Sequence, residues 1–376
     1  MSAGIGNDLH VVLFDLPRPP LTLRGPSHAG NRRTLRTRWT TVSGMSKVDL
    51  VARVAEVTGV GSLLRRLGSW EGVLAFTYHR VGFPDESYCA ASWDATPPMF
   101  EEQVRLLAKE FDAIGLDDLD AAVRAGRGRY VLITFDDAYR DNFEEAFPIL
   151  KRCGVTATFF ITTGFVDGRH ISWWDEVGWM VHMSPKTELR ADGWIEQPLS
   201  LEAEDRSHAV KSLMDRYKRL PADEVSAFME TLAESTGSGR HPNGAYDPWM
   251  TWDDIRSLHA GGMHIGGHTV THRLLGQLTA AEQEREIVGC KQRIEAELGV
   301  PMRSLSYPDG GRSSFDRETR RILAENGVDF AFSFYGGYRK FDDWDPYDVR
   351  RRWLSTSVTR DRFAMMVTLP QVFTWR

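Results

Sequence analysis

The sequence predicts an α/β fold in which helices wrap a parallel sheet, either open or closed as a barrel. Apolar, β-rich segments alternate with amphipathic ones along most of the chain, which is the pattern of parallel strands joined by helices. Segments such as "VTATFFI" (155–161) are apolar throughout, as strands buried on both faces are. A length of 376 residues suits one large α/β barrel or two ordinary domains.

The first elements have clear boundaries. A strand is predicted over 72–81 and a helix over 96–111, which has prolines in its first turn. The next strand ends at Phe135. A helix over 139–152 follows it, and Gly154 closes that helix as a glycine cap.

After the strand at 155–161 the alternation stops, and we expect a helical insert at about 165–250. The insert contains two helical stretches, 201–219 and 221–236. Pro221 is predicted at the first helical position of the second stretch.

The alternation then resumes. Thr251 and Asp254 predict a capping box at the start of a helix, and Thr279 with Glu282 predicts another, for a helix that ends at Gly299. The remaining predicted elements are strands at 263–267, 303–308 and 328–334 and a helix at 314–327.

The N-terminal region differs from the rest of the chain. Residues 1–44 hold arginines but no lysine and show little periodicity, which predicts a disordered or extended lead. From Met45 the sequence is that of an amphipathic helix, so translation from Met45 is the alternative to a translated lead. We divide the chain into this lead, a helical segment at 45–71, and the barrel with its insert at 72–376. "LLRRLGSW" (63–70) is predicted to be a packed helix end, with contact to a membrane face as the alternative.

The composition excludes several classes of protein. A net charge of -6 and a pI near 6.0 argue against a nucleic-acid binder, which needs a basic face. The three cysteines are widely spaced and form no Cys-x-x-Cys pair, which argues against a disulfide framework and favours a reducing compartment. The sequence has neither a transmembrane-length apolar run nor a secretory signal, so we expect a cytoplasmic protein.

Two adjacent carboxylates, Asp136 and Asp137, follow the strand that ends at Phe135. A solvated loop is one interpretation. A metal site is the other, in which one carboxylate binds the cation and its neighbour stays free to take a proton from the water that the cation activates.

A second stretch, "HIGGHTVTH", places His268 and His272 four residues apart after a short predicted strand. On a helical turn both rings point the same way and can bind one ion. The alternative is that the two histidines have this spacing by chance and bind no metal. An aspartate at the end of another strand would complete an Asp-His-His set, since parallel α/β folds gather their sites at strand ends. Three protein ligands with a vacant position are typical of catalytic zinc.

A third stretch, "LSYPDGG" (305–311), also lies at a strand end. Pro308 and the glycines force a tight turn that can present a backbone N–H, that of Asp309, to an oxyanion. An ordinary turn after a strand is the alternative.

These three stretches, in this order, resemble the polysaccharide deacetylase family, the carbohydrate esterases that share the chitooligosaccharide deacetylase homology domain. The resemblance covers residues 74–352, and "TFDD" and "HTVTH" are its specific motifs. It implies a deformed (β/α) barrel of parallel strands and metal-dependent hydrolysis of N-acetyl groups on sugars. On the matching positions it implies that Asp136 is the catalytic base and that Asp137, His268 and His272 bind the metal, usually zinc.

The chain departs from the family pattern at two places. Ser306 stands where the third motif usually has an arginine that steadies the base, so another group must orient Asp136. No histidine follows His272, although the family usually supplies a general acid near the C-terminus. His79, in "FTYHRV", is the candidate acid, as in the similar branch that deacetylates poly-N-acetylglucosamine. A packed core histidine is the alternative.

Other side chains have two possible roles. Asp175, in "SWWDE", is a candidate substitute partner in the site. The adjacent Trp173 and Trp174 either stack on a sugar ring or anchor the insert on the barrel. "RRRW" (350–353) is predicted to be a solvated strand edge, with an arginine brought towards the rim of the site as the alternative.

We therefore predict a metal-dependent hydrolase, with zinc as its cofactor, that removes an N-acetyl group from an N-acetylated sugar. The expected substrate is a cytoplasmic precursor that is free, nucleotide-linked or lipid-linked. The alternatives are an amidase that acts on non-carbohydrate amides or imides, and a catalytically inactive barrel that binds glycan.

Overall fold

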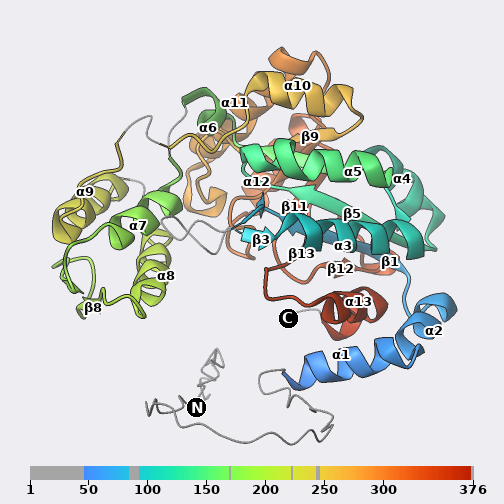
Figure 1. The fold of residues 1–376 in the computed structure, drawn as a ribbon. Coiled ribbons are helices and arrows are strands. Elements are labelled where there is room, and N and C mark those ends of the chain that lie inside the picture. The colour runs from blue at the N-terminus through green and yellow to red at the C-terminus, as the bar shows by residue number, and fades with distance from the viewer. Residues whose placement is uncertain (1–45, 84–92, 169–170, 222, 243–245, 374–376) are drawn as a thin grey trace, which may run out of the picture. The chain divides into compact units, whose positions relative to one another are not determined.

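The structure is a computed structural model that describes residues 46–83, 93–168, 171–221, 223–242 and 246–373. Its centre is a barrel of seven parallel strands (Figure 1). The strands follow one another around the ring in chain order: β1 (Gly72–Tyr78), β5 (Arg129–Phe135), β6 (Thr158–Ile161), β9 (His264–Gly267), β10 (Ser304–Ser306), β11 (Phe330–Ser333) and β13 (Val349–Trp353). The ring closes because β1 pairs with both β13 and β5. The predicted barrel of parallel strands is thereby confirmed.

Short strands supplement the ring. β4 (Asp112–Ala113) pairs with β5 and β12 (Tyr338–Arg339) pairs with β1. Outside this sheet, β2 (Arg80–Val81) pairs with β3 (Trp93–Ala95).

Helices surround the ring (Figure 1). They are α3 (Pro97–Glu110), α4 (Leu116–Ala125), α5 (Phe147–Cys153), α10 (Trp252–Ala260), α11 (Ala280–Leu298), α12 (Arg317–Glu325) and α13 (Arg360–Thr368), with short 3-10 turns η3 (Leu275–Gln277), η4 (Phe341–Asp343) and η5 (Pro370–Val372).

The strands are buried on both faces. Along β1, Val73 and Ala75 join an apolar cluster that contains Phe332, whereas Leu74 and Phe76 join the larger cluster shared with the outer helices. Burial on both sides explains why these strands are apolar throughout rather than alternating.

The predicted helical insert lies between β6 and α10. It contains α6 (Thr163–Gly168), α7 (Trp173–His182), α8 (Arg206–Tyr217) and α9 (Val225–Thr236), with the antiparallel strands β7 (Glu188–Leu189) and β8 (Leu199–Ser200). α7 packs on α8 and on α9. An apolar cluster separate from that of the barrel holds these helices together and includes Val177, Met180, Leu213, Phe228 and Leu232.

The predicted N-terminal helix is two helices, α1 (Lys47–Val57) and α2 (Val60–Leu67). The break falls at Gly59, whose φ of 78° a helix cannot continue. Arg65 is buried, and it donates hydrogen bonds to Glu56 and Thr368. The segment 63–70 is therefore packed in part, with Arg65 and Trp70 buried but Leu63 and Leu67 exposed. The lead at 1–44 lies outside the described residues.

Some boundaries match and others do not. The capping boxes at Thr251 and Thr279 are confirmed. The helix predicted over 139–152 is confirmed as a helical stretch, but its first half is a π-helix, η2 (Asn142–Ala146), which precedes α5. Pro148 explains the difference, because in a regular α-helix its ring would clash with the carbonyl four residues earlier. Pro221 is not the first residue of α9, which begins at Val225.

Candidate active site

The pairing of β1 with β5 brings two predicted site residues together. The strands pair along their whole length and end with Tyr78 opposite Phe135. The next residues, His79 and Asp136, therefore leave the carboxyl ends of neighbouring strands side by side. The Asp136 N–H donates to the Tyr78 carbonyl at 2.9 Å, which continues the pairing by one bond.

Unusual backbone conformations mark all three predicted stretches. Among the described residues, those other than glycine with positive φ have φ between 59° and 76°, and they are Asp137, Ala138, Thr269, His272 and Asp309. Such a conformation costs a residue about 1–3 kcal/mol, and it persists where surrounding contacts impose it. The strain is therefore concentrated where the candidate site residues lie.

The structure brings Asp137, His268 and His272 into one cluster. Nε2 of each histidine lies 3.4 Å from Asp137 Oδ1. The possible ligand atoms of the three residues all lie within 4.8 Å of one another. His268 Nδ1 donates to the Ser306 carbonyl at 2.8 Å, which leaves Nε2 as the ring nitrogen that faces Asp137.

The two histidines do not lie on a helical turn, and that part of the prediction is wrong. Residues 268–274 form an irregular loop after β9, in which the backbones of Thr269 and His272 are left-handed. The His272 N–H donates to Thr269 Oγ1 at 3.1 Å, which stabilises the turn between the two rings. Spacing alone could not show this conformation.

Two other elements hold this loop, and nothing in the sequence pointed to them. Glu286, on α11, accepts hydrogen bonds from the N–H groups of Val270 and Thr271, each at 2.8 Å. From α6, the Gly164 N–H donates to the Val270 carbonyl at 2.8 Å. A Cβ on Gly164 would lie 2.4 Å from that carbonyl oxygen, so this close approach needs glycine.

The cluster fits a divalent cation. Asp137 is buried, and within the described part of the chain its Oδ1 has no hydrogen-bond partner. Burial lowers the pKa of His272 to about 4 despite the nearby charge of Asp137, so the ring is neutral at pH 7. Two imidazole nitrogens and one carboxylate oxygen are the donor set of zinc sites with an open position.

Asp136 has a buried cationic partner. Both oxygens of Asp136 accept hydrogen bonds from the Arg351 guanidinium, at 2.7 and 2.8 Å. Ser306 Oγ accepts from the same guanidinium at 2.8 Å and donates to Asp136 at 3.1 Å. Arg351 also donates to the hydroxyls of Thr77 and Thr134 inside the barrel.

This network corrects two expectations. The stretch 350–353 is not a solvated strand edge, because β13 lies between β1 and β11 and Arg351 is 1% exposed. Arg351 takes the steadying position beside Asp136 that Ser306 cannot fill. Asp175, the other candidate partner, instead accepts hydrogen bonds from Tyr139 and Ser172.

The charges around Asp136 keep it ionised. Burial by itself raises the pKa of Asp136, but Arg351, together with His268 and His79, more than offsets burial and holds the pKa well below its usual range. The carboxylate is therefore ionised at neutral pH and oriented by its neighbours.

His79 is paired rather than simply packed. Its Nδ1 lies 3.2 Å from a carboxylate oxygen of Asp94, which is fully buried and also accepts from Trp353 Nε1 at 2.5 Å. Burial by itself lowers the pKa of His79, but Asp94, with Asp137 and Asp136, raises it to about 9. The ring therefore carries a proton at neutral pH. Nothing in the sequence pointed to Asp94 as its partner.

Asp309 lies at the rim of the same site. In the described part of the chain its backbone N–H has no hydrogen-bond acceptor. Its carboxylate is bound by the Lys218 ammonium, which comes from the insert. The turn that carries Asp309 is thus tied to the insert.

One cavity of about 320 Å³ is lined by the candidate site residues His79, Asp136, Asp137, His268, His272 and Asp309. The insert supplies part of its wall through Trp173, Trp174 and Lys218. Trp174 is buried against His272, with ring centroids 4.7 Å apart, so it anchors the insert. Trp173 is half-buried, stacks on Tyr217 and still faces the cavity.

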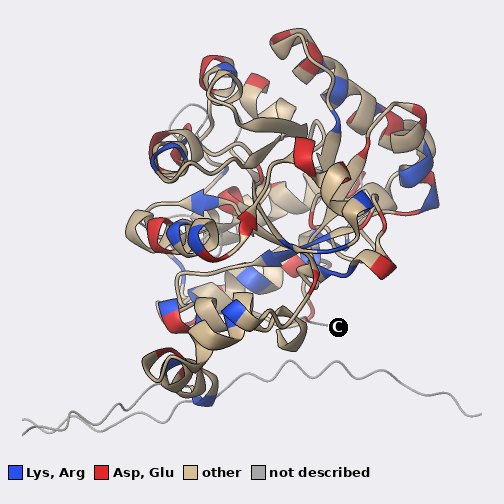
Figure 2. Cartoon of the chain, turned by 90° about the vertical axis from the view of Figure 1, so that its right-hand side faces the viewer, with Lys and Arg blue, Asp and Glu red and all other residues tan. Residues whose placement is uncertain are grey.

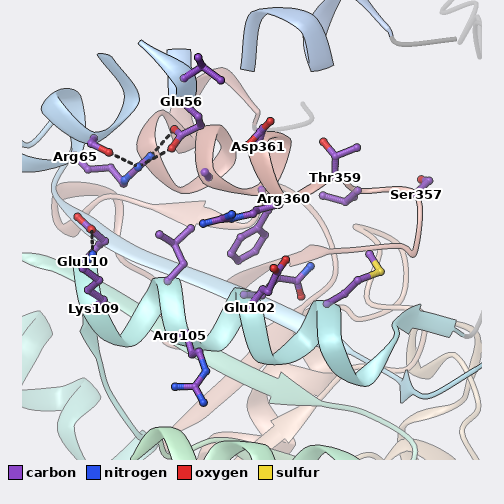
Figure 3. Close-up of a pocket in the computed structure, with 18 of the residues that line it drawn as sticks. Glu56, Arg65, Glu102, Arg105, Lys109, Glu110, Ser357, Thr359, Arg360 and Asp361 are labelled. Carbon is purple, nitrogen blue, oxygen red and sulfur yellow. Dashed lines mark hydrogen bonds and ion pairs between the residues drawn. The ribbon is translucent and has the colours of Figure 1, made fainter. Parts of the chain in front are cut away.

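A larger hollow of about 810 Å³ lies elsewhere, between α1, α3 and α13 (Figure 3). Its charged side chains are of both signs, among them Glu102, Arg105 and Arg360. The Asp-His-His cluster is not part of it, so the chemistry belongs to the smaller cavity.

Fold and site together define the class of protein. A parallel barrel that gathers two buried carboxylates and two histidines at the carboxyl ends of its strands has the architecture of an α/β-barrel hydrolase. Residues 124–331, more than half of the chain, match the sequence profile of the family described as polysaccharide deacetylase. The chain belongs to the polysaccharide deacetylase family. That membership supports a hydrolase that deacetylates N-acetylated sugar polymers.

Individual relatives are distant or partial. The structure of the Streptococcus pyogenes deacetylase PplD in complex with acetate is similar with a TM-score of 0.53 and 15% identity, over 79% of this chain and 98% of that one. A Bacillus cereus polysaccharide deacetylase has a TM-score of 0.49 and 16% identity, over 79% and 69%. A Bacillus subtilis protein named "Putative polysaccharide deacetylase YxkH" is 48% identical over 40 residues, which span 11% of this chain and 14% of that protein.

Proposed function

We propose that this protein is a metal-dependent deacetylase that hydrolyses the acetamido group of an N-acetylated sugar. One observation carries the proposal most directly. A buried carboxylate, Asp136, is kept ionised by Arg351 directly beside the Asp137, His268 and His272 cluster. Amide hydrolysis by a metal enzyme needs this combination of a general base and an open cation site.

Asp137 Oδ1 and Nε2 of His268 and His272 would hold the cation, with zinc the best match to their donor set. When bound, zinc would act as a Lewis acid toward the acetyl carbonyl. Asp136 accepts the proton of the attacking water. Arg351 fixes the direction of both Asp136 oxygens and keeps them charged.

Two further groups complete the reaction. The Asp309 N–H donates a hydrogen bond to the oxygen of the acetyl carbonyl as it becomes negative. His79, whose Nδ1 is held by Asp94, donates the proton on Nε2 to the leaving nitrogen when the C–N bond breaks. The products are acetate and a free amino sugar.

The shape of the cavity supports a sugar substrate. Its volume of about 320 Å³ and its aromatic lining by Trp173, Phe334 and Trp353 suit a pyranose ring, whose apolar face stacks on aromatic side chains. The half-exposed face of Trp353, with 46% of the residue exposed, remains available at the rim.

The test is acetate release from a panel of N-acetylhexosamine compounds, both polymeric and free, nucleotide-linked or lipid-linked, beside metal analysis of the purified full chain. We expect bound metal, acetate release, and a loss of at least a hundredfold in Asp136→Asn, with Asp118→Asn on the exposed face of α4 as the matched control. Bound metal without acetate release from any sugar would move the assignment to non-carbohydrate amides. Absence of metal would overturn the site.

The role of His79 needs a separate test. His79→Gln should lose amide hydrolysis about a hundredfold or more but keep hydrolysis of an aryl acetate, whose leaving group needs no proton. Equal losses on both substrates would show that His79 acts structurally.

A further inference from the structure

The outward side of the two N-terminal helices is unusually apolar. Among the described residues, 13 large hydrophobic side chains are exposed, and eight of them lie on α1 and α2. Seven of these eight, exposed by 45–73%, form what we call the α1–α2 face: Val48, Leu50, Val51, Val54, Val60, Leu63 and Leu67. The eighth, Val57, lines the hollow between α1, α3 and α13. An apolar cluster of this extent on two consecutive helices marks an interaction surface.

The charges beside these side chains have one sign. Between residues 46 and 68 the exposed charged side chains are Lys47, Arg53 and Arg66. The acidic side chains of the two helices are less exposed, and Glu56 is bound on the inner side to Arg65 through two bonds of 2.8 Å (Figure 3). Elsewhere acidic and basic residues are interspersed over the helices of the molecule, whose net charge is -6 (Figure 2).

The α1–α2 face is not the side by which the helices attach to the barrel. α1 packs on α13. The attachment is made by small and polar groups, with Ala52 buried, Arg65 bound to Thr368, and the Arg65 carbonyl accepting from Arg129. The apolar side chains of the α1–α2 face therefore stay exposed when the helices pack on the barrel.

Charge distinguishes between possible occupants of this face. In a symmetric dimer the α1–α2 face would meet a copy of itself, so the positive charges of Lys47, Arg53 and Arg66 on the two copies would repel. The preceding segment 1–44 carries six arginines and two aspartates, which is the same sign of charge as the face. An anionic surface with an apolar interior complements both properties of the face, as in helices that lie in a membrane interface.

We propose that the α1–α2 face binds the surface of an anionic lipid bilayer, with the helices lying along the interface. The helices remain on one side of the bilayer, since no helix in the described residues is long and apolar enough to span it. The proposal is independent of the chemistry assigned to the active site.

The test is co-sedimentation of the full chain with vesicles of phosphatidylcholine alone or mixed with phosphatidylglycerol. We expect binding to the mixed vesicles that weakens as salt rises, because exposed charges are screened. A Val54→Glu/Leu63→Glu variant should bind at least tenfold more weakly. Val300→Glu is the matched control, since Val300 is an exposed apolar residue outside the α1–α2 face, and it should bind as the wild type does.

Two measurements keep the outcome clear. Equal melting temperatures for the variant and the wild type would exclude loss of folding as the cause of weaker binding. The proposal would be overturned if the wild-type protein did not bind vesicles containing phosphatidylglycerol at low salt. So would a wild-type dimer that Val54→Glu/Leu63→Glu converts to a monomer, since the occupant would then be a second copy of the chain.

Discussion

Asp136 and Arg351 form an ion pair whose side chains are almost fully buried. In Arg351→Met the carboxylate of Asp136 would stay buried without its partner, and breaking such a pair costs about 3–5 kcal/mol. We expect a free energy of unfolding lower by about that amount, measured by urea denaturation. Arg351→Met/Asp136→Asn should recover most of the loss, because the charge that needs a partner is gone. An Arg351→Met variant as stable as the wild type would contradict this account of the pair.

We predict that the paired histidine, His79, sets the pH dependence of the proposed reaction. The proposed acid, His79, works only when protonated, so activity should fall as pH rises through its pKa. The surrounding carboxylates hold that pKa at about 9, and a cation bound at Asp137 would oppose them and lower it toward the ordinary value of 6.5. We therefore expect kcat/KM to fall on the alkaline side, with a midpoint between pH 6.5 and about 9.

Asp136 should contribute no limb near neutrality, because its pKa is held well below the usual range. The measurement is kcat/KM against pH for the wild type and for His79→Gln. The variant should lose the alkaline limb together with most of its rate. An alkaline limb that persists unchanged in His79→Gln would assign it to another group.

At the scale of elements, the loop 268–274 depends on α11. Glu286 holds the N–H groups of Val270 and Thr271 between the two histidines. Glu286→Gln keeps the size of the side chain but loses the charge-assisted bonds, so the histidines should be held less firmly. We expect zinc affinity to fall by about 10–100-fold, the range seen when groups that orient metal ligands are changed.

The matched control is Glu284→Gln, on the exposed side of the same helix. Competition for zinc with a chromophoric chelator measures both variants. Equal zinc affinity in Glu286→Gln and the wild type would show that the loop is held without this carboxylate.

The elements also show what the sequence could and could not predict. Local signals were reliable, since the strand before Asp136 and the caps at Thr251 and Thr279 each depend on neighbouring residues. The loop of His272 was not predictable from spacing, because its conformation is imposed by contacts with α6 and α11.

Contacts between residues far apart in the sequence were the main feature that the sequence could not predict. Arg351 meets Asp136 across 215 residues of sequence, and a run of arginines at 350–352 has the composition of a solvated edge. Only the closure of the barrel places that strand beside β1, where the guanidinium turns inward. The missing family arginine did signal that some substitute had to exist, but the sequence did not say which.

At the scale of the whole molecule, the cation site joins distant parts of the barrel. Asp137 follows β5, while His268 and His272 follow β9, and β6 lies between these two strands in the ring. A cation held by all three binds the folded chain and not the unfolded one. It therefore stabilises the fold by RT ln(1 + [L]/Kd), which is about 2.7 kcal/mol at a hundredfold excess over Kd.

Removal of metal should consequently lower the melting temperature of the full chain by several degrees, and added zinc should restore it. The measurement is thermal unfolding with and without a chelator. Asp137→Asn, which loses the shared carboxylate, should melt at the same temperature with or without chelator. Activity is not needed for this readout, so it tests the site even if the substrate is still unidentified. If neither chelator nor zinc changed the melting temperature of the wild type, Asp137, His268 and His272 would not act together as ligands.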